Sequence, residues 1–234
     1  EIYTKFSQSI NTWLTQHTST GILYETDLRL RPNGASGLLV STTEAFTQYQ
    51  REQAWVWEHQ ALTRARFIAG DPRVETAFEQ TRKEILCQQR DLMTLKQDIS
   101  NMRAKMLNAQ LKPTAPPDIK YSRGGIIDVE FIVQYLVLAH ACKFPILTGN
   151  IGNIALLKLA GKLGLIRVDS AERVRIAYRE FRRIQHRLRL SGNPELTSTT
   201  LKEDPSQKLT HAETDSLDDV SNAALQLWDE VFGM

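Results

Sequence analysis

Residues 21–34 read GILYETDLRLRPNG, a segment that alternates apolar and polar side chains and ends in a turn signal. Successive side chains of a β-strand point to opposite faces of a sheet. The alternation therefore predicts a strand over residues 22–31 with one apolar and one charged face. The Pro-Asn-Gly at residues 32–34 predicts a turn. Residues 38–40 then predict a short return strand, which completes an antiparallel hairpin.

The sequence around this hairpin has helical periodicity. Tyr3, Phe6 and Ile10 share one face of a 3.6-residue period, which predicts a helix at the start of the chain. Further helical segments are predicted near residues 42–52, 53–67, 71–89, 95–106, 126–141, 152–164, 169–190 and 216–232. The prolines within residues 110–117 predict a loop, and residues 190–215 are polar and predicted to be irregular. The sequence therefore predicts an α+β fold that is mostly α, with one small antiparallel sheet.

The composition is that of an ordinary globular protein and excludes several classes. The chain has 234 residues, of which 41% are hydrophobic and 24% charged, with a net charge of +2. This near balance gives no bulk electrostatic case for nucleic acid or a membrane surface as a partner. The two cysteines, Cys87 and Cys142, favour a reducing cytosol, so we expect a cytoplasmic protein. The longest apolar stretch contains Asp128 and Glu130, which argues against a membrane span.

The charged face of the predicted strand is the first candidate site. Asp27, Arg29 and Arg31 are two residues apart and are expected on the same side of the strand. A carboxylate that can bind a divalent cation, beside two fixed cations, is what a triphosphate site needs. The alternative from spacing alone is an exposed edge face with cross-strand ion pairs. The five histidines are not spaced as metal ligands.

A second candidate site lies at the start of the apolar helix predicted over residues 126–141. Residues 118–122, which include Lys120, are expected to be extended and are followed by a glycine pair. Such a pair lets a ligand approach the backbone closely, and a helix N-terminus favours anions. Asp128 and Glu130 are two apart, do not share a helix face and are not expected to chelate one metal. Alternatively, both acids simply complement the helix dipole.

A third candidate is a basic stripe on the predicted helix at residues 169–190. Seven arginines crowd this helix, and five of them are spaced by three or four residues along one side. Such a stripe is compatible with a phosphate or an acidic partner. The alternative is a solvated face whose charges are balanced by neighbouring acids.

Several of these segments together resemble the glutamine synthetase adenylyltransferases. The matching segments are residues 21–40, Trp57–Leu62 (WEHQAL), Ala65-Arg66 with Gly70-Asp71, Gly124–Phe131 (GGIIDVEF) and Phe181–Leu188 (FRRIQHRL). Proteins of this family have two related nucleotidyltransferase halves. The ASG sequence after the turn and the WEHQAL segment are more similar to the C-terminal, adenylylating half. The alternative is the half that removes adenylyl groups by phosphorolysis.

The resemblance implies a nucleotidyltransferase domain similar to DNA polymerase β, followed by a helical domain. We expect a truncated nucleotidyltransferase sheet within residues 1–72 and a helical bundle over residues 73–234. In that fold three carboxylates hold two magnesium ions, and Asp27 occupies the position of the third. The first two belong to an Asp-x-Asp motif, which this sequence lacks. Because the chain opens at Glu1 inside a helical pattern, we expect it to be a piece of a longer protein.

The implied reaction transfers AMP from ATP to a tyrosine of glutamine synthetase and thereby regulates nitrogen assimilation. Asp27 is then a catalytic metal ligand, and Arg29, Arg31 and Lys120 are phosphate-binding candidates, with Arg66 a weaker one. Asp128 and Glu130 are possible cleft residues that position the helical domain. The expected partners are glutamine synthetase and the PII nitrogen-signal protein, with Mg²⁺ and ATP as cofactor and substrate. The alternative is a helical interaction module that docks either protein, since the isolated chain is expected to lack catalysis.

Overall fold

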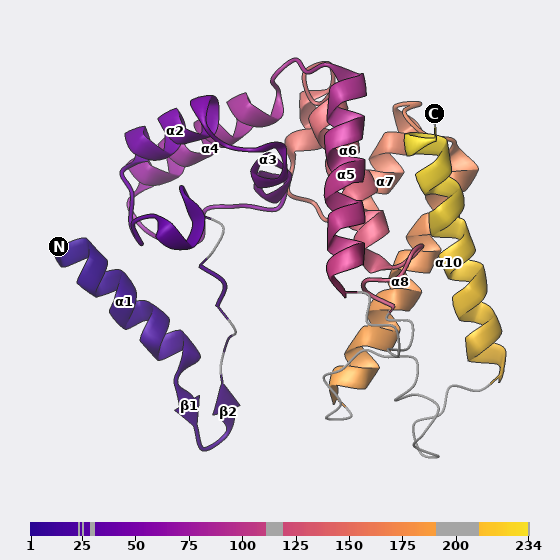
Figure 1. The fold of residues 1–234 in the computed structure, drawn as a ribbon, viewed down its shortest axis with the longest axis horizontal. Coiled ribbons are helices and arrows are strands. Elements are labelled where there is room, and N and C mark those ends of the chain that lie inside the picture. Colours follow the sequence, from indigo (N-terminus) through magenta and orange to yellow (C-terminus); the bar gives the residue numbers. More distant parts are fainter. Residues whose placement is uncertain (23, 25, 29–30, 111–118, 191–210, 234) are drawn as a thin grey trace. The chain divides into compact units, whose positions relative to one another are not determined.

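The computed structural model describes residues 1–22, 24, 26–28, 31–110, 119–190 and 211–233. Contacts within the chain divide it into two compact units, Glu1–Ile85 and Leu86–Met234. Figure 1 shows the helices that make up most of both units. Among the described residues, none of the helices is long and apolar enough to cross a bilayer. The predicted division into a nucleotidyltransferase part at 1–72 and a helical domain at 73–234 stays a prediction.

The first unit contains a small hairpin and four helices. Its elements are α1 (Ile2–Thr15), β1 (His17–Thr18), β2 (Gly21–Ile22), the 3-10 turn η1 (Gly34–Ser36), α2 (Thr43–Glu52), α3 (Val56–Leu62) and α4 (Pro72–Leu86). The two strands are antiparallel, with His17 opposite Ile22 and Thr18 opposite Gly21. The described part of the chain is therefore mostly helical with one two-stranded sheet, as the sequence predicts.

The predicted strand over residues 22–31 is wrong for the part of it that the structure describes. The strand β2 ends at Ile22, and residues 24 and 26–28 have no regular structure. A strand persists only where its backbone groups find a ladder partner. Beyond the hairpin, Tyr24 N donates to Leu14 O at 3.1 Å, and the described residues of the segment form no ladder. Two apolar side chains that the strand was expected to place on one face are open to solvent, with Tyr24 59% and Leu28 41% exposed.

The predicted turn is confirmed, whereas the return strand is not. Asn33 takes the left-handed conformation with φ 61°, and Gly34 N donates to Arg31 O at 2.8 Å. A tight turn tolerates asparagine there because its short polar side chain suits that conformation. The chain then forms η1, and residues 38–40 are irregular. Without a strand at 22–31 to pair with, the return segment has no ladder to join.

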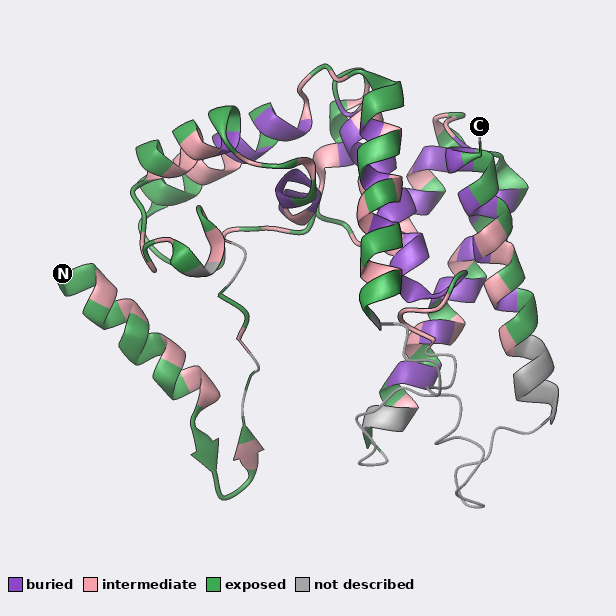
Figure 2. Ribbon diagram, viewed as in Figure 1, coloured by how far each residue is buried: buried purple, intermediate pink, exposed green. Residues whose placement is uncertain are grey.

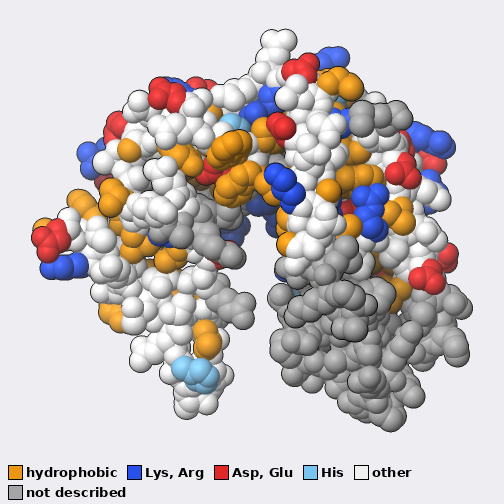
Figure 3. Space-filling model, in the orientation of Figure 1, with side chains coloured by type: hydrophobic (Ala, Val, Ile, Leu, Met, Phe, Trp, Pro, Cys, Tyr) orange, Lys and Arg blue, Asp and Glu red, His pale blue; other side chains and the backbone are white. Residues whose placement is uncertain are grey.

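Helix α1 is amphipathic but unburied. Its apolar residues include Phe6, 61% exposed, and Trp13, 69% exposed, and no residue of the helix is buried. In the view of Figure 3, orange hydrophobic side chains lie on the visible surface of this helix. A helix of this length gains most of its stability from packing an apolar face and is marginal without it.

We therefore predict that the amides of α1 exchange with solvent far faster than those of the apolar helix at Ile126–His140. The physical reason is that eleven residues of the latter helix are buried, whereas none of α1 is. Hydrogen–deuterium exchange followed by mass spectrometry of the 234-residue chain measures both. Equal protection of the two helices would contradict the prediction.

Short polar caps fix the starts of the other helices in this unit. The helix α2 is capped by Thr42, whose Oγ1 accepts from Ala45 N at 3.1 Å. The helix α4 begins after Asp71, whose Oδ1 accepts from Arg73 N at 2.8 Å. Between them, α3 is seven residues long, shorter than the predicted 53–67.

The second unit is a helical bundle built around one apolar helix. Its elements are α5 (Leu92–Gln110), α6 (Ile126–His140), the 3-10 turn η2 (Pro145–Thr148), α7 (Asn153–Lys162), α8 (Val168–Leu190) and α10 (His211–Phe232). Helix α6 packs against α5, α7, α8 and α10, so it is buried nearly all round, as the purple segments in Figure 2 show. The predicted helices are confirmed here. Nearly all of the loop predicted at 110–117 and most of the irregular segment predicted at 190–215 lie outside the described residues. The prediction is wrong for residues 211–215, which form the start of α10.

Residues 119–125 differ from the predicted extended segment. They form consecutive turns that lead directly into α6. The reason is the set of side-chain and backbone contacts that hold these turns, which are described below.

Candidate functional site

Of the three residues expected on one strand face, the two that the structure describes, Asp27 and Arg31, are not in a strand. Asp27 is exposed and lies in an irregular segment, and Arg29 lies outside the described residues. Arg31 is half-buried at the turn, where its Nε donates to Gly37 O at 3.4 Å and its Nη1 donates to Leu28 O. The arginine therefore braces the turn with its own guanidinium. Asp27 and Arg31 both remain in the first unit, five residues or fewer from that turn.

The described residues do not by themselves fit a two-metal site. No group of three or more His, Cys, Asp or Glu side chains gathers in the part of the chain that the structure describes. A two-metal clamp needs several carboxylates around two closely spaced ions. Asp27 offers one, and the sequence contains no Asp-x-Asp that would supply the others.

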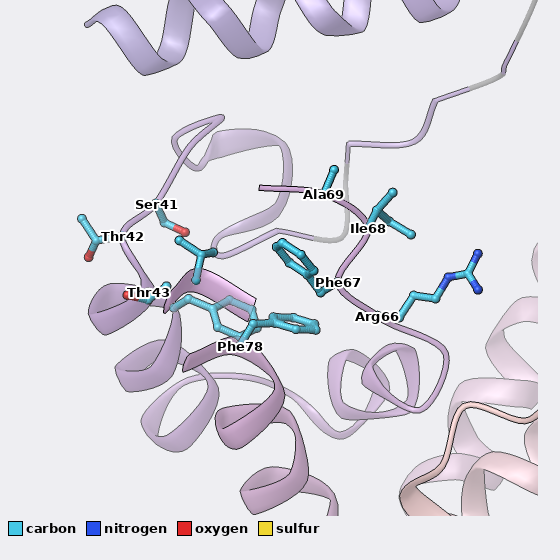
Figure 4. A pocket seen from close by; sticks show the side chains of 10 residues that line it. Ser41, Thr42, Thr43, Arg66, Phe67, Ile68, Ala69 and Phe78 are labelled. Atoms are coloured by element: carbon cyan, nitrogen blue, oxygen red, sulfur yellow. The ribbon is translucent and has the colours of Figure 1, made fainter. Parts of the chain in front are cut away.

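Arg66 lies beside a pocket of about 320 Å³ in the first unit. Three phenylalanines line it, and Phe46 and Phe78 stack with ring centroids 5.7 Å apart. Figure 4 shows Phe67 and Phe78 projecting inward and the Arg66 guanidinium pointing away from them. The hydroxyl-bearing Thr43 lies on the opposite side. The volume is at the low end of small-molecule sites, and the phenylalanine lining suits a flat apolar group.

The WEHQAL segment has a structural role in this geometry. Glu58 caps α3 by accepting from Trp55 N at 2.9 Å, and it also accepts from the Tyr49 hydroxyl at 2.8 Å. His59 Nε2 lies 3.0 Å from Gln50 O. Burial and the Glu58 carboxylate raise the pKa of Tyr49, which keeps its hydroxyl a donor. These bonds tie α2 to α3.

The glycine pair before α6 is held by a buried ion pair that crosses from α5. Arg103 and Asp128 are 1% and 0% exposed, and Arg103 Nε donates to Asp128 Oδ1. Arg103 Nη2 also donates to Tyr121 O at 2.7 Å and to Ser122 O at 3.1 Å. The other oxygen of Asp128 accepts from Gly124 N at 2.6 Å. We call residues 119–125, held in this way, the latched loop.

Backbone bonds complete the latched loop. Ile126 N donates to Ile119 O at 3.0 Å, Ile127 N to Lys120 O at 3.2 Å, and Gly125 N to Ser122 O at 3.0 Å. A Cβ on Gly125 would collide with Ile119 O, so only glycine fits. The N–H groups at the start of α6 are therefore already occupied. This favours the interpretation that Asp128 serves the helix start over an open anion site at the helix N-terminus.

Asp128 and Glu130 make separate contacts, as their spacing predicts. Glu130 is half-buried and accepts from the Tyr178 hydroxyl at 3.1 Å, which itself accepts from Asn153 Nδ2 at 2.9 Å. Burial and the Glu130 charge raise the pKa of Tyr178 above its usual value. The cluster ties α6, α7 and α8 together.

Three arginines of α8 pair with acids of the same helix. Arg173 lies 3.7 Å from Asp169, and Arg183 donates to Glu180 with a closest distance of 2.6 Å. Arg175 pairs with Glu172. These contacts favour the interpretation of a charge-balanced face.

Arg103 is the residue that sequence reasoning missed. It lies within the helix predicted near residues 95–106, where an arginine ordinarily points to solvent. The only sequence signal was the position of this arginine, four residues after the apolar Ile99. Its burial depends on Asp128, twenty-five residues away, and no local pattern reports such a pair.

Two family models match adjoining parts of the chain. The model of glutamate-ammonia ligase adenylyltransferase matches residues 1–81. The model of GlnD PII-uridylyltransferase matches residues 93–220. Both models are named for enzymes that transfer nucleotidyl groups.

Curated relatives narrow this class to one family. The chain is 64% identical over 232 residues to a bifunctional glutamine synthetase adenylyltransferase/adenylyl-removing enzyme of Nitrosomonas europaea, covering 99% of this chain and 25% of the relative. It is 63% identical to the protein of the same name from Nitrosomonas eutropha, covering 100% and 25%, and 47% identical to that of Neisseria meningitidis, covering 100% and 24%. The chain belongs to the glutamine synthetase adenylyltransferase family. It spans about a quarter of the length of these relatives.

Proposed function

We propose that this chain is part of the adenylylating half of such an enzyme, which transfers AMP from ATP to a tyrosine of glutamine synthetase. The observation that carries the proposal is the 64% identity, over nearly the whole chain, to a relative named for both adenylylation and adenylyl removal. The choice of half rests on the similarity of the ASG and WEHQAL segments to the adenylylating half. The PII protein and a cytoplasmic location belong to the proposal as well.

The proposed domain arrangement has the end of a nucleotidyltransferase domain followed by a helical domain. The uncovered apolar face of α1 and the exposed Tyr24 and Leu28 support it, because such surfaces are ordinarily packed against further structure. In the complete nucleotidyltransferase fold the segment around Asp27 is a strand. The alternation of residues 22–31 suits that state once neighbouring strands supply a ladder.

The proposed roles in this chain are assigned residue by residue. Asp27 is the metal-binding carboxylate, and the two further carboxylates that Mg²⁺ needs are supplied from outside these residues. Arg29 and Arg31 in the first unit are proposed to bind phosphate, with Arg66 a further candidate beside the phenylalanine-lined pocket, and Lys120 is a separate phosphate-binding candidate in the second unit. Cations at these positions neutralise charge on the transferring group. Asp128 and Glu130 organise the helical domain, and neither is assigned a contact with the substrate.

The Asp27→Asn variant of the complete enzyme tests this proposal. It removes a charge and nearly preserves shape, and Asp27 is exposed, so folding should survive. Loss of a ligand from a two-metal site should lower kcat by about a hundredfold or more. Labelled AMP incorporation into glutamine synthetase is the measurement. The control is Asp91→Asn, because Asp91 only caps α5, by accepting from Thr94 N at 2.8 Å, and asparagine caps equally well. A wild-type rate with normal magnesium dependence in Asp27→Asn would refute the metal role.

A second candidate function is an interaction module in the helical domain. The match of residues 93–220 to the PII-uridylyltransferase model favours it, because that model is named for PII, which is one of the expected partners. Binding of the 234-residue chain to PII or to glutamine synthetase would be measured directly by calorimetry. Tight binding together with no catalysis would support the module for this piece.

A further inference from the structure

We infer that Arg103 and Asp128 are positioning residues for Lys120, acting through the latched loop. The inference rests on the proposed role of Lys120 in binding the phosphates of ATP. It adds a residue, Arg103, that neither the motifs nor the family resemblance indicated.

The latched loop turns its backbone carbonyls inward. Ile119 O and Lys120 O accept from the first turn of α6, and Tyr121 O and Ser122 O accept from Arg103. Four consecutive carbonyls are thus bound within the protein. Carbonyl oxygens repel anions, so turning them inward removes an obstacle to phosphate at the outer face of the loop.

The cationic side chains of the loop are carried by this fixed backbone. Lys120 is half-buried, with Nζ 4.9 Å from the centre of the Tyr121 ring, and Arg123 is exposed, 5.3 Å from the centre of the Trp228 ring. A lysine that must meet a phosphate gains affinity when its backbone does not have to be ordered on binding. The buried ion pair of Arg103 and Asp128 holds the backbone of the latched loop in place before a ligand binds.

Two features of the loop show that this order depends on tertiary contacts. Gly124 has φ +74°, and a Cβ there would lie 2.5 Å from Ser221 O of α10. Asp128 then accepts from Gly124 N, so the loop is confined between α10 and the Arg103 guanidinium. Neutralising Asp128 leaves the guanidinium without its carboxylate and loosens the loop at both ends.

The test uses the 234-residue chain, with inorganic tripolyphosphate as the probe. The variants are Lys120→Ala, Asp128→Asn and Arg103→Lys. The last of these keeps the positive charge but lacks the forked guanidinium that reaches two carbonyls. The matched control is Ser170→Ala, which removes the partly buried hydrogen bond from Ser170 to Glu230 (2.7 Å) and leaves the loop intact. Circular dichroism melting establishes that each variant is folded at the assay temperature.

Trypsin reports the order of the loop, because it cleaves after Lys120 and Arg123. Cleavage at these two sites should be about tenfold faster in Asp128→Asn than in the wild type, since local opening governs cleavage. Arg103→Lys should show an intermediate rate, and Ser170→Ala the wild-type rate. Calorimetric titration reports function. Lys120→Ala and Asp128→Asn should each raise the Kd of tripolyphosphate by about tenfold, the size of one lost charged hydrogen bond.

The outcomes separate this inference from the proposed function. If Asp128→Asn and Arg103→Lys open the loop but keep the wild-type Kd while Lys120→Ala loses affinity, the positioning role is overturned and the phosphate role of Lys120 stands. If Lys120→Ala binds tripolyphosphate as the wild type does, both are overturned. Should Asp128→Asn fail to fold, Arg103→Lys decides the matter by the same two measurements. Weaker binding in Ser170→Ala equal to that in Asp128→Asn would also overturn the inference, because a general loss of stability would then explain it.

Discussion

We expect no transfer of AMP to glutamine synthetase by the isolated 234-residue chain, at any magnesium concentration. Nucleotidyl transfer depends on positioning and on neutralising charge, and the protein supplies little covalent chemistry of its own. The chain has no Asp-x-Asp, and Asp128 and Glu130, its only Asp-x-Glu, make separate structural contacts. The arginines and Lys120 are still expected to bind ATP weakly, because phosphate binding needs cations more than metals.

The measurement is incubation of the purified chain with labelled ATP, magnesium and glutamine synthetase, followed by counting of labelled protein. The positive control is a complete adenylyltransferase under the same conditions. Incorporation well above a reaction without the chain would show that the carboxylates present suffice.

The second large effect is expected at Arg103. The Arg103→Leu variant should lose about 3–5 kcal/mol of unfolding free energy in the second unit, because it leaves the Asp128 carboxylate buried without its partner. The control is Arg183→Leu, which breaks an exposed pair with Glu180 on the same bundle and should change stability by less than about 1 kcal/mol. Urea unfolding followed by circular dichroism measures both.

The double variant Arg103→Leu/Asp128→Leu sharpens this prediction. Removing both charges leaves no uncompensated ion, so the double variant should be less destabilised than the single variant Arg103→Leu. Arg103 Nη1 is buried without a hydrogen-bond partner among the described residues, so the pair is not fully satisfied to begin with. Additive losses in the double variant would mean that the two side chains contribute independently.

The helices of this protein are determined largely by local sequence. The apolar face of α1, the Asp71-Pro72 start of α4 and the continuous apolar run of α6 each identify a helix, because helix periodicity and capping involve residues within four positions of one another. The turn at Asn33 follows from the same kind of short-range preference. The family membership also follows from the sequence, since it rests on short contiguous sequence motifs.

The tertiary structure alone decided what surrounds those elements. The alternation at residues 22–31 satisfies the pattern of a strand, yet a strand needs partners that are distant in sequence, and the described residues provide a ladder only at β1 and β2. The same holds for Asp128, which spacing alone left open between a ligand site and a helix-dipole role. Its pairing with Arg103, twenty-five residues away, joins two helices, and the burial that makes this pair strong exists only once the bundle has formed.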